Sequence, residues 1–222
     1  AELVKNKEIT CGDEINICVP TGNFGNILAA YYAKEMGVPI KKLICASNSN
    51  NVLTEFIRTG VYNKNRTFVT TNSPSMDILI SSNLERLLYH MSDGDSELVA
   101  SLMRSLNEDG VYEVPDKIKA KLSEIFYAAY CDDKFTLRTI SDIERNYSYV
   151  MDTHTAVAQN VYEQYLAQTH DSTKTVIAST ASPFKFAGSV VSAIEGEDAV
   201  AGKDEFELIG ILSGIAEEKP PK

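Results

Sequence analysis

Residues 21–26 read TGNFGN, a short segment with two glycines and two asparagines between two apolar runs. The run before it, INICVP, is short and rich in β-branched residues, and the run after it, ILAAYYAKEMG, has helical spacing. A glycine-rich turn between a strand and a helix places free backbone N–H groups at a helix N-terminus, where the helix dipole favours an anion. The segment is therefore a candidate phosphate-binding loop.

Glycine suits such a loop because the backbone must approach a ligand closely or take a positive φ, and Gly22 and Gly25 meet that need. Thr21, Asn23 and Asn26 could add side-chain hydrogen-bond donors. The spacing is not that of a Walker P-loop, because no lysine follows Gly25, and the third glycine of a dinucleotide fingerprint is absent. A tight turn whose glycines serve only the backbone geometry is the alternative explanation.

The elements around the loop predict an α/β protein with a mostly parallel sheet flanked by helices. Strands are expected at residues 15–20, 41–47, 66–71 and 174–180. Helices are expected at residues 27–37, 51–60, 153–168, 184–194 and 205–218. Residues 81–150 are mainly helical in pattern, including 116–130, and are expected to form an insert. Residues 1–80 and 151–222 would then make up the α/β domain.

Charge and composition exclude several classes of partner. The chain has 222 residues, a net charge of −10 and 44% hydrophobic residues, which argues against nucleic acid or an anionic membrane as partner. No apolar stretch is long enough to span a bilayer. The four cysteines show no metal-ligand spacing, and Cys18 and Cys45 are expected in the core. Because the opening AELVKNKEIT is polar and charged, a cytoplasmic location is expected.

Four stretches, the first two of them long, resemble the threonine synthases of bacteria and fungi, a family that depends on pyridoxal 5'-phosphate (PLP). They are VPTGNFGNILAAYYAKEMGVPIKKLICASNSNN, TTNSPSMDILISSNLERLLYHM, DTHTA and STASPFKF, and they occur in the family's order. The resemblance implies the tryptophan-synthase-β-like fold (PLP fold type II), with the cofactor in a cleft between two α/β domains. It also implies conversion of the small-molecule substrate O-phospho-L-homoserine, with water, into L-threonine and phosphate.

The resemblance assigns roles to particular residues. A hydroxyl at the end of the strand in STASPFKF would hydrogen-bond the pyridine nitrogen, which points to Thr180, or to Ser179 if the register differs by one residue. The glycine-rich segment would hold the cofactor phosphate through Thr21, Gly22, Asn23, Phe24, Gly25 and Asn26.

The roles of several other residues are less clearly assigned by the resemblance. In NSPSMD, Ser73, Ser75 or Asp77 could contribute to the substrate end of the cleft, or the segment could be a turn. His154 could cap or brace the helix that follows it, or act in catalysis. Lys185 is interpreted as structural, because the family places its Schiff-base lysine in a different sequence context.

That lysine lies in a Ser-Phe-Lys-Asp context upstream of the glycine-rich loop, and none of this chain's lysines has that context. The resemblance therefore implies the C-terminal half of a threonine synthase, which would be inactive alone because the N-terminal domain with the lysine is absent. An exposed cleft face could lead to self-association. The alternatives are a non-catalytic module that binds PLP or phosphate, and an unrelated α/β protein that binds sugar phosphates or nucleotides.

Overall fold

A four-stranded parallel sheet forms the centre of the chain, in the order β5-β2-β1-β6. The computed structural model describes residues 2–217, so the last residue of the helix expected at 205–218 lies outside the described residues. The strands of this sheet are β1 (Ile15–Pro20), β2 (Ile40–Ser47), β5 (Phe126–Tyr130) and β6 (Thr175–Ile177). A separate antiparallel pair joins β3 (Val61–Asn63) to β4 (Val111–Glu113).

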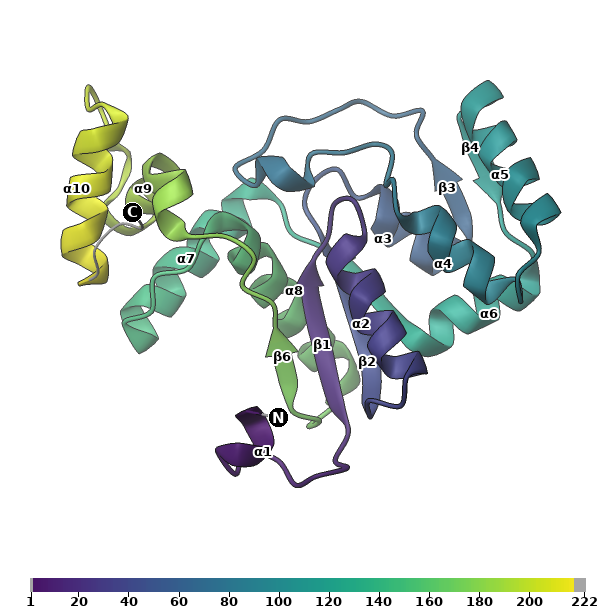
Figure 1. The fold of residues 1–222 in the computed structure, drawn as a ribbon. Coiled ribbons are helices and arrows are strands. Elements are labelled where there is room, and N and C mark those ends of the chain that lie inside the picture. The colour runs from purple at the N-terminus through teal and green to yellow at the C-terminus, as the bar shows by residue number, and fades with distance from the viewer. Residues whose placement is uncertain (1, 218–222) are drawn as a thin grey trace.

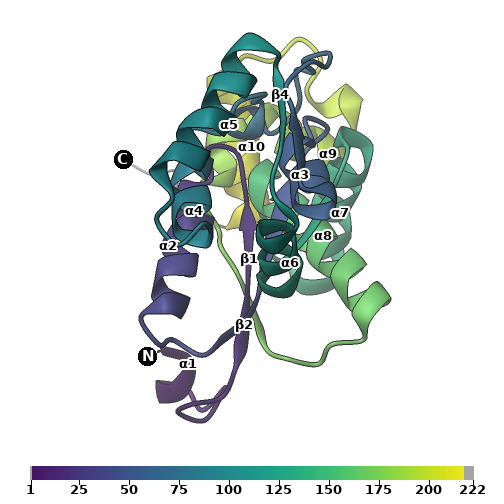
Figure 2. The ribbon, with the colours of Figure 1, turned by 90° about the vertical axis from the view of Figure 1, so that its right-hand side faces the viewer.

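Helices cover both faces of the sheet, as expected for a parallel sheet. Figure 2 shows α2 and α4 on one side of β1 and α7 and α8 on the other. The α-helices are α1 (Glu2–Lys5), α2 (Gly25–Glu35), α3 (Val52–Thr59), α4 (Leu84–Met91), α5 (Ser96–Glu108), α6 (Asp116–Ile125), α7 (Asp133–Tyr147), α8 (Thr153–Thr169), α9 (Ala187–Glu195) and α10 (Glu205–Ala216). Three 3₁₀ turns are η1 (Pro74–Met76), η2 (Pro183–Phe186) and η3 (Glu197–Ala199). None of the helices in residues 2–217 is both long and apolar enough to cross a membrane.

Successive side chains of the central strands point to opposite faces of the sheet, so the core on the sheet is divided into two layers. Val19 and Cys45 join the cluster with α2, α3 and α4, whereas Cys18 and Ile44 join the cluster with α8. Both cysteines are fully buried, which confirms their expected place in the core. Burial raises the pKa of the Cys45 thiol to about 12, so that thiol stays neutral at physiological pH.

A third cluster packs α9 against α7 and α10 against α9. In Figure 1 this group lies at one end of the molecule, and α4, α5 and α6 lie at the other, with the sheet between them. The strand and helix expectations at both ends of the chain are confirmed, including β1, β2, α8 and β6. The predicted mostly parallel α/β architecture is confirmed as well.

Two predicted elements differ from the structure. Residues 66–71 form no strand; instead, the backbone of Val69 is hydrogen-bonded on both sides by the Asn50 side chain, and the Thr71 N–H donates to Asp77. Side chains thus satisfy these backbone groups, so no neighbouring strand is needed. Residues 126–130 were predicted to continue a helix but form β5, which pairs with β2. Part of the expected helical insert therefore belongs to the central sheet.

Candidate functional site

The glycine-rich loop and Thr180 lie at the carboxyl ends of two adjacent parallel strands. β1 and β6 pair with Cys18 opposite Ile177, and Thr21 and Thr180 each follow three residues later. From β1 the chain crosses through α2 to β2 on one side, while β6 lies on the other side. In open α/β sheets, ligands bind in the crevice where the strand order reverses in this way.

A cavity of about 280 Å³ opens at this position, and all seven predicted cofactor-binding residues line it. Asn23, Gly25, Asn26 and Thr180 are exposed to it, whereas Thr21 and Phe24 are buried beneath. Ser75, Met76, Asn83, His154, Ala181 and Lys185 complete most of the remaining wall. The structure therefore brings the predicted residues together around one space, and their role in binding stays a prediction.

The carbonyl groups of the loop are held by residues 81–83. Ser81 Oγ donates to the Gly22 carbonyl at 2.9 Å, and the backbone N–H of Asn83 donates to the Asn23 carbonyl at 3.2 Å. The described peptide bonds are all trans, so each N–H points opposite to the carbonyl of the preceding residue. The N–H groups of Asn23 and Phe24 therefore point away from residues 81–83.

The amide groups of the loop are not used by the protein itself. Within residues 2–217, the N–H groups of residues 22–27 have no hydrogen-bond acceptor, and the first turn of α2 has no side-chain cap. Phe24 accepts at its carbonyl from the N–H of Leu28, so the Gly25 N–H points off the start of the helix. This arrangement supplies several unpaired donors and a helix dipole beside a cavity, which suits an anion.

The two glycines allow close approach, as predicted, but do not supply the positive φ that the sequence also suggested for them. Neither has a positive φ; that conformation falls on Phe24, at φ 66°, whose ring packs on Phe126. A Cβ at Gly22 would lie 2.7 Å from the Ser75 carbonyl oxygen, so Gly22 is required by the neighbouring turn. A Cβ at Gly25 would meet only Asn83, at 3.7 Å. Gly25 thus leaves the space in front of the helix open.

Thr21 and Thr180 have different surroundings. The Thr21 hydroxyl donates to the Val19 carbonyl at 2.7 Å, so its proton is engaged inside the protein. Thr180 lines the cavity of the glycine-rich loop, while Ser179 lines a second cavity. Of the two registers considered for the hydroxyl near the ring nitrogen, this placement favours Thr180.

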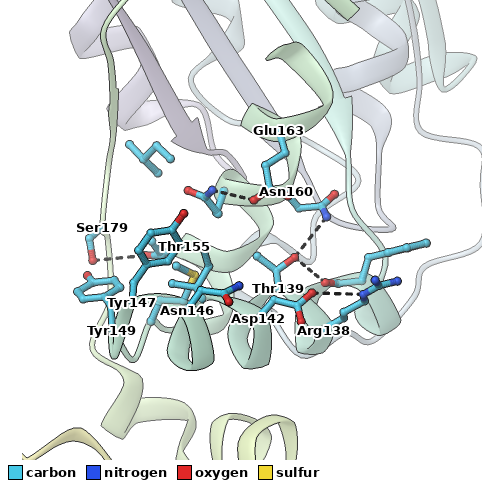
Figure 3. A pocket seen from close by; sticks show the side chains of 15 residues that line it. Arg138, Thr139, Asp142, Asn146, Tyr147, Tyr149, Thr155, Asn160, Glu163 and Ser179 are labelled. Carbon is cyan, nitrogen blue, oxygen red and sulfur yellow. Dashed lines mark hydrogen bonds and ion pairs between the residues drawn. The ribbon is translucent and has the colours of Figure 1, made fainter. Parts of the chain in front are cut away.

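The second cavity is larger, about 930 Å³, and is bordered by α7, α8 and the end of β6. Figure 3 shows Arg138 and Asp142 paired on α7, with Tyr147, Tyr149 and Ser179 on the opposite part of the wall. Its ionic groups are paired or exposed, and within its wall the Thr155 hydroxyl donates to the Ser179 hydroxyl at 3.4 Å. Sequence reasoning did not identify this cavity.

In the segment NSPSMD, some residues stabilise a turn and another lines the cavity, so both predicted interpretations apply to part of it. Ser73 and Asp77 belong to a network with Asn48 and Thr71, in which the Asn48 amide donates to Asp77 at 2.7 Å. These two residues therefore stabilise a turn. Ser75 instead lines the cavity of the glycine-rich loop.

Lys185, which the sequence suggested to be structural, is exposed and lines the same cavity, with its ammonium 5.5 Å from the Phe186 ring centroid. Within the described residues it forms no ion pair. A cation thus lies on the wall of a cavity that already contains free amide donors. The short spacing between Thr180 and Lys185, across one turn, is the signal that could have indicated this.

The chain is similar to known proteins of one enzyme family. The family model "Threonine synthase, C-terminal" matches residues 155–219. Threonine synthase of Saccharomyces cerevisiae is 38% identical over 197 residues, which cover 82% of this chain and 38% of the yeast protein. The chain belongs to the threonine synthase family.

Other members of the family agree. Threonine synthase-like 1 of Homo sapiens is 42% identical over 195 residues, covering 87% of this chain and 26% of the human protein. The crystal structure of PLP-bound threonine synthase from Brucella melitensis superposes with a TM-score of 0.81 at 31% identity, over 97% of this chain and 44% of that chain. The predicted fold type II architecture is therefore confirmed. The chain spans less than half the length of each of these relatives.

Proposed function

We propose that this chain supplies the phosphate-binding side of a PLP site in a threonine synthase. The observation that carries the proposal is the set of unpaired N–H groups at residues 22–27, which border a cavity at the start of α2. PLP would supply an electron sink for the carbanion formed beside the substrate's amino group. Its phosphate is a dianion of the kind that such a helix start attracts.

Several residues would share the work of holding the cofactor. The backbone from Gly22 to Asn26 would bind the phosphate, and the Asn23 and Asn26 side chains could add donors. The Thr180 hydroxyl, on the neighbouring strand end, would meet the pyridine nitrogen. Because a hydroxyl is neutral, it would orient the ring without holding that nitrogen protonated.

For the whole protein we propose the conversion of O-phospho-L-homoserine and water into L-threonine and phosphate. None of the lysines in this chain has the Ser-Phe-Lys-Asp context of the residue that bonds the cofactor. We therefore expect the 222-residue chain alone to release no phosphate from this substrate. Treatment with PLP and borohydride should label no lysine stoichiometrically.

One substitution separates the phosphate site from a turn that only shapes the backbone. Gly25→Asp places a carboxylate in the open space at the start of α2. An acidic residue in the first turn favours a helix, so the free energy of unfolding should stay the same or rise. Affinity for PLP, measured by equilibrium dialysis, should fall by more than tenfold because the carboxylate repels the phosphate.

Ser96→Asp is the matched control, since it adds an acidic residue at the first position of α5, away from the cavity. Pyridoxal, which lacks the phosphate, is the control ligand and should bind Gly25→Asp and the unchanged chain equally weakly. Equal PLP affinity in Gly25→Asp and the unchanged chain would refute the phosphate site.

A non-catalytic PLP-binding module remains the second candidate. The identity to threonine synthase-like 1 of Homo sapiens, 42%, exceeds the 38% identity to the yeast threonine synthase. The coding sequence upstream of residue 1 discriminates the two candidates. A Ser-Phe-Lys-Asp segment together with phosphate release by the longer protein supports the enzyme, and a longer protein that binds PLP without turnover supports the module.

A further inference from the structure

His154 lies buried between the start of α8 and the turn that contacts the glycine-rich loop. Its side chain is 2% exposed and borders the cavity. The N–H of Ser75 donates to its Nε2 at 3.2 Å, and its Nδ1 lies 3.2 Å from Asp152 Oδ1. On its other side the ring packs on Phe186, with the ring centroids 4.7 Å apart.

These partners fix the protonation form of the imidazole. A backbone N–H can only donate, so Nε2 must present its lone pair to Ser75. The Asp152 carboxylate accepts, so the proton lies on Nδ1 and the ring is neutral. Burial alone would raise the pKa of Asp152, but hydrogen bonds from His154 and Thr155 hold it below its ordinary value. Asp152 is therefore ionised and orients the ring.

The turn held by His154 is the one that determines the shape of the loop. The Ser75 carbonyl oxygen lies so close to Gly22 that a Cβ there would be 2.7 Å away. From the other side, Ser81 Oγ donates to the Gly22 carbonyl at 2.9 Å. The backbone at Gly22 is thus confined between η1 and residue 81, and a movement of Ser75 would change its conformation.

We propose that His154 is a positioning residue that, as a neutral imidazole, holds the Pro74–Met76 turn against Gly22 and so sets the conformation of the phosphate-binding loop. The proposal rests on the proposed function of that loop. It also predicts a dependence on pH. A proton added at Nε2 would turn the acceptor into a donor that faces the Ser75 N–H, and the turn would then lose its anchor.

Charged groups around the ring come from three elements. Asp152 lies at the start of α8, and Lys185 from η2 lines the same cavity. Asp77 ends η1, but its oxygens accept from Asn48, Asn50 and Thr71. Asp152 and Lys185 are therefore the two of these groups whose charge is not already engaged by the polar network of Asp77.

Two variants distinguish the effect of the hydrogen-bond acceptor at Nε2 of His154 from the effect of the ring's packing. His154→Gln keeps an amide oxygen that can accept from Ser75 at any pH, whereas His154→Phe keeps the packing on Phe186 without an acceptor. His154→Phe should bind PLP about three- to tenfold more weakly at pH 8, the worth of one hydrogen bond. His154→Gln should restore most of that affinity.

The decisive measurement is PLP affinity between pH 8 and pH 5 for these three chains. The second ionisation of a phosphate monoester, near pH 6, affects them equally and cancels when affinities are compared. The unchanged chain should lose about three- to tenfold more affinity across this range than His154→Gln, the same loss that His154→Phe shows at pH 8. Identical pH profiles for the two would overturn the proposal.

NMR of the full 222-residue chain tests the coupling without a ligand. The amide signals of Ser75 and Gly22 should shift together with the titration of the His154 ring, and should not shift in this way in His154→Gln. If the Ser75 and Gly22 amide signals do not change as the His154 ring is titrated, the proposal is overturned whether or not PLP binds. Coupled signals in a chain that binds neither PLP nor inorganic phosphate would support the anchor and refute the proposed function.

Discussion

Phe24 shows most clearly what one residue contributes to this site. It is 1% exposed and carries the positive φ that the sequence suggested for a glycine. A positive φ is unfavourable for a bulky residue, but the ring's contact with Phe126 on the sheet offsets the cost. Neither glycine then has to supply the positive φ. Gly22 instead allows the Ser75 backbone to approach closely, and Gly25 leaves the space in front of α2 open.

Lys185 provides a prediction at the residue scale. Its ammonium borders the same cavity as the free amides of residues 22–27. Lys185→Gln should weaken PLP binding about three- to tenfold, a modest effect because the side chain is exposed to solvent. The loss should shrink as salt is added, since ions screen an exposed charge.

Equilibrium dialysis at two salt concentrations measures both effects. Lys203→Gln removes an exposed positive charge that does not border the cavity, and it should leave PLP affinity unchanged. If the two variants bind equally well, Lys185 is structural, as the sequence alone suggested.

Among the elements, the sheet depends on one carboxylate that sequence reasoning did not single out. Asp171 accepts hydrogen bonds from Asn16 on β1 and from Tyr165 on α8. It also pairs with Lys41 on β2 at 2.8 Å and accepts from the Thr173 hydroxyl at 2.7 Å. Its side chain keeps 9% of its surface exposed. One side chain thus connects two strands and a helix at the end of the sheet opposite the glycine-rich loop.

This network predicts the effect of pH on stability. Burial would raise the pKa of Asp171, but the bonds from Lys41 and Tyr165 outweigh it and hold the pKa well below the ordinary value of 3.8. The ionised form is therefore favoured by folding, and its contribution is complete above about pH 5 and decreases as the pH falls through the unfolded value. Asp171→Asn should lower the free energy of unfolding at pH 7 by about 1.5–3 kcal/mol.

Urea unfolding at pH 7 and pH 3.5 tests this expectation. The difference between the chain and Asp171→Asn should be smaller at the lower pH, because the wild-type carboxylate then loses part of its advantage. Asp198→Asn, at an exposed position in η3, should match the unchanged chain at both pH values. A constant difference between the chain and Asp171→Asn would contradict the assigned role of the charge.

Helices and strands were predicted correctly where the residues of the segment itself determine its structure. β1 was predicted with its observed bounds, because an apolar β-branched run between polar segments has few other uses. FYAAY was misread because alanine and aromatic residues also suit a helix, and its identity as β5 is decided by pairing with β2, more than 80 residues earlier. At 66–71 the β-branched residues were correct for an extended backbone, but the Asn50 side chain replaced the neighbouring strand.

For the whole molecule, the position of the site follows from strand order. The glycine-rich loop was identified from sequence because strand, glycines and helix are adjacent along the chain. Thr180 was matched only through family resemblance, since nothing local shows that β6 pairs with β1. The bond between Ser75 and His154 joins residues 79 positions apart, so only the folded chain reveals it.

The face around the larger cavity supports a last prediction at this scale. β6 is an edge strand of the described sheet, and Phe135, Tyr147 and Tyr149 beside the cavity are 47%, 72% and 51% exposed. An unpaired strand edge next to exposed aromatic side chains tends to associate.

We expect the 222-residue chain to self-associate through this face as its concentration is raised, which sedimentation velocity would measure. The double variant Tyr147→Ser, Tyr149→Ser should associate less, whereas Phe206→Ser, which removes an aromatic residue 84% exposed on α10, should behave like the unchanged chain. Sedimentation as a monomer at every concentration would show that this face needs no partner.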